Sequence, residues 1–116
     1  MINYMTEEIT WADFQKVKLR IGTITQVEDF PEARRPAYKL WVDLGEELGI
    51  KKSSAQVTEL YTKDQLIGKQ VLCVCNFPAK QVGPLMSEIL VTGFHTENGV
   101  SLASPDHAVT NGSRLV

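Results

Sequence analysis

The chain has 116 residues, of which 12 are lysine or arginine and 14 are aspartate or glutamate, so its formal charge is −2. This length predicts a single domain over residues 1–116, with a core large enough to fold without disulfides or a metal. The acidic balance is similar in both halves of the chain, which excludes a basic tail and disfavours a surface built wholly to bind phosphates. No signal peptide is visible in residues 1–11 and no apolar run could span a membrane, so we expect a soluble, cytoplasmic protein without membrane insertion.

The first predicted element is a short helix, and a strand follows it. Thr10 can cap a helix at residues 10–14, because its hydroxyl can accept a hydrogen bond from the backbone of Asp13, whose carboxylate suits the positive helix end. A strand is then predicted over residues 18–29, because Leu19, Ile21 and Thr23 alternate with Arg20 and Gly22 in the period of two that marks a strand with one face toward a core. Gly22 inside this strand permits the tight coiling by which a strand turns the corner of a barrel.

The remaining elements follow in the order of a small barrel. Strands are predicted at residues 37–44, 50–57, 70–76, 88–94 and 100–103, and a short helix, with a threonine and a glutamine at capping-box spacing, at residues 62–66. Residues 71–75 are apolar on both strand faces, as are residues 89–91, although a barrel strand exposed to water should alternate. The N-terminal helix, a ligand or a second copy of the chain could cover this surface. Because the helix is too short to cover it alone, we expect a homodimer.

The two cysteines favour a structural interpretation. Cys73 and Cys75 share one face of a predicted strand about 7 Å apart, which is too far for a disulfide. His95 and His107 are isolated in the sequence, so no metal site is expected. Two small core residues are the simpler interpretation, since free cysteine is commonly buried.

Nothing in the sequence predicts catalysis or a cofactor. Ser53 and Ser54 have no histidine nearby in the sequence that could activate a hydroxyl. The segment with two glycines at residues 45–49 lacks the Lys-Ser/Thr that completes a phosphate-binding loop, and its two glutamates would repel phosphate. We therefore expect a binding protein that is not an enzyme and that uses no cofactor, metal or nucleotide.

Several short motifs together indicate a family. They are Leu19-Arg20-Ile21-Gly22-Thr23-Ile24, Phe30-Pro31-Glu32-Ala33-Arg34, Lys39-Leu40, Gly49-Ile50-Lys51 and Ser53-Ser54-Ala55-Gln56. With them the chain resembles the small OB-fold tRNA-binding domain family, and within it the CsaA-like export chaperones. The resemblance extends through Asn111-Gly112. It implies an all-β, five-stranded OB-fold barrel with a short N-terminal helix, and a homodimer.

The same resemblance separates two ligands. After their fourth strand, tRNA-binding relatives are typically basic and lead into a Ser-x-Gly-Met pattern. This chain retains Asn76, Lys80 and Ser87 there but has Ile89 in place of the glycine, and a single cation remains in the run. Ser53-Ser54-Ala55-Gln56 matches the chaperone branch. The resemblance therefore implies a chaperone that holds extended segments of export-destined proteins, with a tRNA-binding module as the alternative and a structural dimer subunit as the third.

OB barrels bind extended polymers across one sheet face, using aromatic side chains for stacking and cations for backbone charge. The residues predicted here to bind peptide or tRNA are Phe30, Arg34, Lys39, Ser53, Ser54, Gln56, Asn76, Phe77, Lys80 and Ser87. Phe30, Phe77 and Trp41 are expected to form apolar walls, while Ser54, Gln56 and Asn76 engage a peptide backbone. Because Pro78 ends the strand, the ring of Phe77 is expected at the barrel rim. Three of these predictions have simpler alternatives: the arginines at residues 34–35 suit a solvated loop, Asn76 suits a strand terminator, and residues 51–54 suit a half-exposed strand with its lysines outside.

Overall fold

The computed structural model of the protein describes residues 7–116, so residues 1–6 of the segment predicted to hold no signal peptide lie outside the described part. Among helices of the described part, none is long and apolar enough to cross a membrane. In chain order the elements are α1 (Trp11–Gln15), β1 (Leu19–Asp29), β2 (Tyr38–Asp43), β3 (Ile50–Ala55), α2 (Lys63–Leu66), β4 (Gln70–Val74), β5 (Lys80–Val82), β6 (Leu85–Ser87), β7 (Leu90–Val91), β8 (Gly93–Thr96) and β9 (Gly99–Leu102).

Both predicted helices are confirmed, and each begins with a complete capping box. The Thr10 hydroxyl accepts a hydrogen bond from the Asp13 N–H, and the Asp13 carboxylate accepts one from the Thr10 N–H, both at 3.1 Å. Thr62 and Gln65 form the same reciprocal pair at the start of α2. These bonds satisfy backbone N–H groups that the first turn of a helix leaves without partners.

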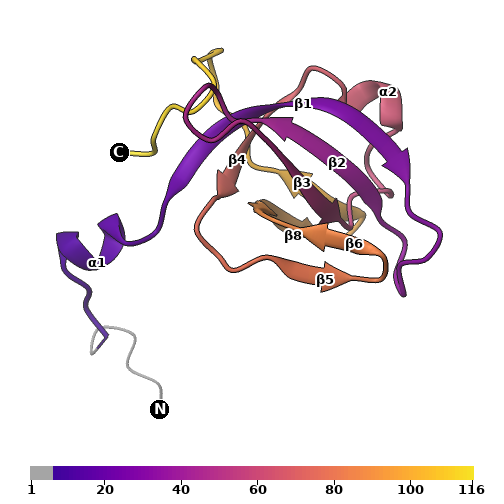
Figure 1. Ribbon diagram of the computed structural model, residues 1–116, viewed down its shortest axis with the longest axis horizontal. Coiled ribbons are helices and arrows are strands. Elements are labelled where there is room, and N and C mark those ends of the chain that lie inside the picture. The colour runs from indigo at the N-terminus through magenta and orange to yellow at the C-terminus, as the bar shows by residue number, and fades with distance from the viewer. Residues whose placement is uncertain (1–6) are drawn as a thin grey trace.

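Five strands coil into a nearly closed antiparallel barrel in the order β3-β2-β1-β4-β7 (Figure 1). β1 is shared by both halves, since Leu19–Thr23 pairs with β4 and Thr23–Asp29 pairs with β2, with an irregular register between Ile24 and Gln26. The barrel closes where the N–H of Glu88 donates to the carbonyl of Lys52 at 2.8 Å. The predicted all-β OB-type barrel with small added helices is confirmed.

The barrel interior is apolar and tightly packed around Gly22. Seven side chains of the central core are fully shielded from solvent: Ile24, Leu40, Val42, Leu44, Leu66, Val71 and Cys73. A Cβ atom on Gly22 would lie 2.4 Å from Val42 Cγ1 and 2.8 Å from Leu44 Cδ2. The glycine is therefore required by close packing inside the barrel. The interior face of β1 thus carries Gly22 and Ile24, while Leu19 and Ile21 lie on the outer face.

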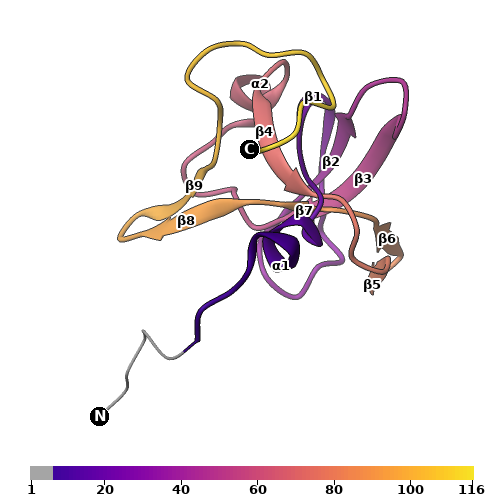
Figure 2. The same ribbon diagram turned by 90° about the vertical axis from the view of Figure 1, so that its left-hand side faces the viewer.

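Two parts of the predicted strand pattern differ from the structure. The strand predicted at residues 88–94 is two strands, β7 and β8, which belong to different sheets. β8 pairs with β9 in a hairpin that extends away from the barrel (Figure 2). The β5–β6 hairpin was not predicted, because its strands have three residues each and show no clear alternation around the Gly83-Pro84 turn. This hairpin forms one side of the groove described below.

The outer face of β4 is better covered than the sequence indicates. Val74 is 7% exposed and Leu72 is half-buried within the single chain. The backbone of Leu72 is bonded on its outer edge to Ala103 and Thr92, at 2.9 and 3.0 Å. Part of this face is thus covered within the single chain, while Leu72 stays half-buried, and the homodimer remains a prediction.

Candidate functional site

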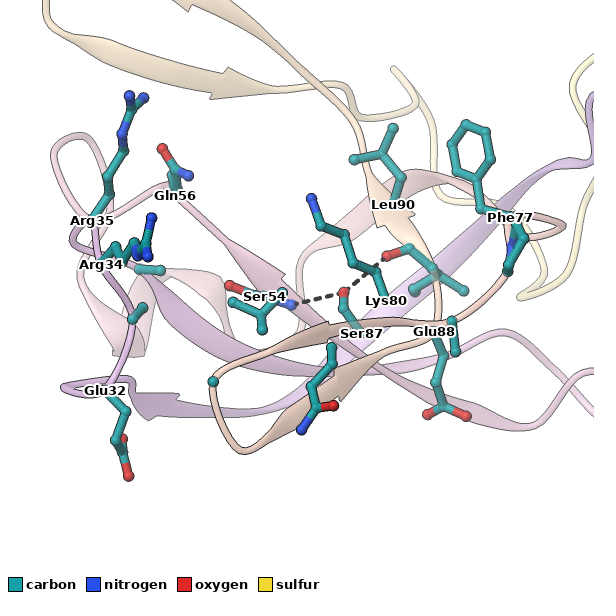
Figure 3. Close-up of a pocket in the computed structure, with 18 residues that line it drawn as sticks. Glu32, Arg34, Arg35, Ser54, Gln56, Phe77, Lys80, Ser87, Glu88 and Leu90 are labelled. Carbon is teal, nitrogen blue, oxygen red and sulfur yellow. Dashed lines mark hydrogen bonds between the residues drawn. The ribbon is translucent and has the colours of Figure 1, made fainter.

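A groove of about 1110 Å³ lies beside the end of β3, between the loop at residues 32–37 and the segment at residues 77–90 (Figure 3). Six of the ten predicted binding residues line it: Arg34, Ser54, Gln56, Phe77, Lys80 and Ser87. These residues are far apart in the sequence and come from three segments. They meet here because the barrel closes at this point, where the ends of the five-stranded sheet approach each other.

β3 determines which of its side chains reach the groove. Successive side chains of a strand point to opposite faces. Ser54 and Gln56 therefore line the groove, while Ser53 and Ala55 point into the barrel. Ser53 is 1% exposed, and its hydroxyl donates to the carbonyl of Ser54 at 3.1 Å. The prediction that Ser53 contacts a ligand was wrong, because a small hydroxyl residue can be buried when its own chain satisfies it.

Ser87 and Glu88 hold β3 against the β6 side of the groove. The Ser87 hydroxyl accepts a hydrogen bond from the Ser54 N–H at 3.2 Å and donates to the carbonyl of Ile89 at 3.4 Å. The Glu88 carboxylate accepts a hydrogen bond from the Lys52 N–H at 3.0 Å. Ser87 was predicted as a binding residue, and in the unliganded chain its hydroxyl is engaged with β3.

Phe77 and Leu90 form an apolar wall on one side of the groove (Figure 3). Phe77 is 55% exposed, which confirms that the chain turns it out at the barrel rim before Pro78. Leu90 is 46% exposed while its neighbour Ile89 is 6% exposed and belongs to the core. Sequence analysis did not select Leu90, although the apolar run at residues 89–91 indicated that one of its faces lies outside the barrel.

The charged side chains of the groove are arranged on two sides. Arg34, Arg35 and Lys80 direct their cationic ends to one side in Figure 3, while Glu32 and Glu88 point to the other. Within residues 7–116 none of the three cations forms a salt bridge. The lining therefore carries three cations and two carboxylates, close to charge balance.

Four predicted binding residues do not line the groove: Ser53, Phe30, Lys39 and Asn76. Phe30 is 3% exposed and packs with Ala37 and Leu85 in a small core cluster of its own. Lys39 places its ammonium 5.1 Å from the centre of the Phe30 ring, a cation–π geometry. The expectation of Phe30 as a groove wall was wrong. Trp41, the other expected wall, is half-buried and also lies outside the groove lining.

Asn76 is the fourth, and its side chain is committed to the N-terminal segment. Its Oδ1 accepts a hydrogen bond from the Lys18 N–H at 3.0 Å, and its Nδ2 donates to the carbonyl of Lys16 at 2.7 Å. Both ends of the amide are used to join the chain after α1 to the end of β4. Asn76 is thus a structural link. This is closer to the interpretation of Asn76 as a strand terminator than to its interpretation as a binding residue.

The cysteines are free, and their environment disfavours reactivity. Burial raises the pKa of the Cys73 thiol to about 12, and burial also raises the pKa of Cys75. Because the thiolate is the reactive form, both thiols are poor nucleophiles near neutral pH. Among the described residues, no group of three or more histidine, cysteine, aspartate or glutamate side chains is placed to hold a metal ion.

A barrel of this type, with an open groove at its closing edge, agrees with the family to which the sequence matches. The chain belongs to the family described as "Putative tRNA binding domain", whose model matches residues 19–114. Within this fold the chain is similar to the crystal structure of the CsaA chaperone protein from Picrophilus torridus. The two are 46% identical with a TM-score of 0.88, over 94% of this chain and 100% of that one.

Two further comparisons extend this result. The chaperone CsaA from Bacillus anthracis is 43% identical with a TM-score of 0.87, over 95% of this chain and 100% of that chain. Among curated proteins, the methionine–tRNA ligase of Methanocaldococcus jannaschii is 32% identical over 94% of this chain, and methionine–tRNA ligase 1 of Bacillus anthracis is 37% identical over 94% of it. The chain spans about a sixth of the length of these ligases, since it covers 16% of each.

Proposed function

We propose that this protein is a chaperone-like binding module, without catalytic activity, that holds unfolded or extended polypeptide segments in the groove beside β3. The observation that carries this proposal is the lining itself. Phe77 and Leu90 offer an apolar wall, Ser54 and Gln56 offer polar groups, and the charges are nearly balanced. Such a surface gains affinity by burying apolar side chains and by bonding to a peptide backbone, and neither requires a particular sequence.

The likeness to two CsaA chaperones supports this choice, because it covers the whole of both chains at 43–46% identity. The sequence resemblance to export chaperones extends the proposal: the clients would be proteins destined for export and the site of action would be the cytoplasm.

Recognition of tRNA is the second candidate, and two observations favour it. The family is described as a putative tRNA-binding domain, and the curated relatives include methionine–tRNA ligases. Arg34, Arg35 and Lys80 are also free to meet phosphates. Yet affinity for nucleic acid depends largely on phosphate neutralisation, and a chain of net charge −2 with three cations at the groove makes few such contacts.

We also propose that two copies associate through the surface around α1. Trp11, Val17 and Leu115 are 64%, 44% and 46% exposed and surround a small cleft of about 170 Å³. Exposed apolar side chains gathered at one place mark interaction surfaces more often than isolated ones do. In a symmetric dimer, the same three residues of a second copy would pack against Trp11, Val17 and Leu115, so that one contact buries both apolar surfaces.

A competition experiment tests the choice of ligand. A fluorescent peptide without stable structure is bound to the protein at physiological salt, and unlabelled tRNA is then added. We expect saturable binding of the peptide. We also expect that unlabelled peptide displaces it, whereas tRNA at the same concentration does not. A protein that does not bind the peptide, or that releases it to tRNA far more readily than to unlabelled peptide, would overturn the proposal.

A further inference from the structure

The outer edge of β3 changes its partner along its length. At Lys52 the edge is closed, because its carbonyl accepts a hydrogen bond from the Glu88 N–H at 2.8 Å and its N–H donates to the Glu88 carboxylate at 3.0 Å. Two residues further on, the Ser54 N–H donates to a side-chain hydroxyl, that of Ser87, at 3.2 Å. Main-chain pairing on this edge therefore gives way to a side-chain contact where the groove begins.

Gln56 is the next residue in this alternation, and it lies just past the end of β3 at Ala55. In a strand paired on one side, alternate residues direct their N–H and C=O groups to the opposite edge. Lys52 and Ser54 direct theirs away from β2, so a backbone that stays extended at Gln56 would do the same. Ser54 and Gln56 both line the groove, and among the described residues neither forms a main-chain hydrogen bond to the segment across it. The Ser54 N–H and carbonyl are engaged only by the hydroxyls of Ser87 and Ser53 on this side.

We propose, on the basis of the peptide-binding function above, that a polypeptide segment binds as an added strand beside Ser54 of β3 and the Gln56 that follows the strand. A carbonyl of the segment replaces the Ser87 hydroxyl as the partner of the Ser54 N–H. The added strand continues, as main-chain pairing, the contact that Glu88 makes with Lys52. An open sheet edge pairs with an extended backbone whatever its sequence, which suits a protein with many clients.

This geometry selects polypeptide over nucleic acid. An added strand must offer N–H and C=O groups at the alternating spacing of a β-ladder, which a polynucleotide lacks. One set of alternate side chains would face Phe77 and Leu90, and the other set would face away from this wall. The hydroxyl of Ser87 keeps the edge satisfied when no segment is bound, so that an unpaired N–H is not left open to unwanted association.

Alternating backbone methylation of the ligand tests strand addition directly. The parent probe is a short fluorescent peptide of alternating leucine and serine, and two derivatives carry N-methyl groups either on all leucines or on all serines. The alternating side chains fix the register, since a one-residue slip would move the leucines to the other face. We expect one derivative to bind roughly tenfold or more weakly and the other within about twofold of the parent.

A matched pair of protein variants makes the same test from the other side. Gln56→Pro removes the backbone N–H of residue 56, whereas Gln56→Ala removes only the side chain and keeps this N–H. We expect the proline variant to bind the parent peptide several-fold more weakly than the alanine variant.

Ser87→Ala tests the exchange of partners at Ser54, with Ser101→Ala as the control. It should bind the parent peptide as tightly as the unaltered protein or more tightly, because no internal hydroxyl then competes for the Ser54 N–H. A clear loss of affinity in Ser87→Ala, with an unchanged melting temperature, contradicts the exchange at Ser54.

The outcomes separate this inference from the function on which it rests. If the parent peptide binds and both methylated derivatives bind equally well, strand addition is wrong while the peptide-binding function stands. If the parent peptide does not bind, both fail. The peptide series uses the unaltered protein, so the test remains decisive even if the proline variant does not fold.

Discussion

At the scale of single residues, Phe77 is the side chain whose exposure and position bear most directly on function. An aromatic ring that is 55% exposed contributes less to folding than a core ring, yet it offers a large apolar surface to a ligand. We expect Phe77→Ala to weaken peptide binding by about 1–3 kcal/mol, the range for an anchoring aromatic. Its effect on the free energy of unfolding should be well below the roughly 3–5 kcal/mol typical of a core phenylalanine.

Phe94→Ala is the matched control for this variant, since Phe94 is 66% exposed on the β8–β9 hairpin and does not line the groove. Melting temperature and peptide affinity are measured for both. If Phe77→Ala melts much earlier but still binds peptide normally, the ring serves the fold and the groove has been assigned wrongly.

Asn76 represents the opposite case, a predicted ligand residue whose bonds are internal. Removing its amide leaves the Lys18 N–H and the Lys16 carbonyl without these partners. We expect Asn76→Ala to lower the free energy of unfolding by about 1–2 kcal/mol and to leave peptide affinity within about twofold. Chemical denaturation and peptide titration of the same sample check both expectations. A stable variant with much weaker peptide binding would return Asn76 to the site.

At the scale of elements, the C-terminal segment is attached along β1 as an extra partner. Gly112 and Leu115 donate backbone hydrogen bonds to Ile21 and Leu19, at 2.7 and 3.0 Å. The side chain of Asn111 fixes the segment, because its Oδ1 accepts hydrogen bonds from Thr23 Oγ1 at 2.6 Å and Gln70 Nε2 at 3.2 Å.

Asn111→Ala should therefore loosen this segment, with a loss of about 1–3 kcal/mol in the free energy of unfolding. Hydrogen exchange should become faster at the Gly112 and Leu115 amides. Peptide affinity should not change, because Asn111 is absent from the groove lining. Unchanged exchange at these two amides would show that Asn111 does not hold the segment.

The elements also show why sequence analysis succeeded in some regions and failed in others. Long strands and capped helices have local signals, a period of two or a threonine with its partner three residues on, and these were found. The inward face of β1 was not identified, because Gly22 faces the interior without a side chain to mark it. The β5–β6 hairpin is too short to show a period.

The candidate site shows the same division. Phe77 was placed at the rim from the proline that follows it, a local cue. The burial of Phe30 depends on Ala37 and Leu85, the second of which is 55 residues away in sequence, and the commitment of Asn76 depends on Lys16 and Lys18. Such tertiary partners are not visible in a single sequence, so a residue type alone did not distinguish a groove wall from a small core.

At the scale of the whole molecule, the proposed dimer can be tested by mass. Light scattering at micromolar concentration should report twice the mass of the 13.0 kDa chain. Val17→Asp, beside the cleft at α1, should yield monomers because a buried unpaired carboxylate is costly. Ile67→Asp is the control, since Ile67 is 52% exposed at the end of α2, outside that cleft. Ile89 is unsuitable for this test because it belongs to the core. A monomer in the unaltered protein would refute the dimer.

The central claim is that the groove binds polypeptide by apolar contact and backbone hydrogen bonds, and the salt dependence of affinity tests it most directly. Each phosphate contact lowers the logarithm of affinity by up to about 0.9 per logarithmic unit of salt, whereas apolar contacts are largely insensitive to salt. We predict that peptide affinity changes little between low and physiological salt, while any affinity for tRNA collapses over the same range. Tight tRNA binding that persists at physiological salt, without measurable peptide binding, would contradict the account.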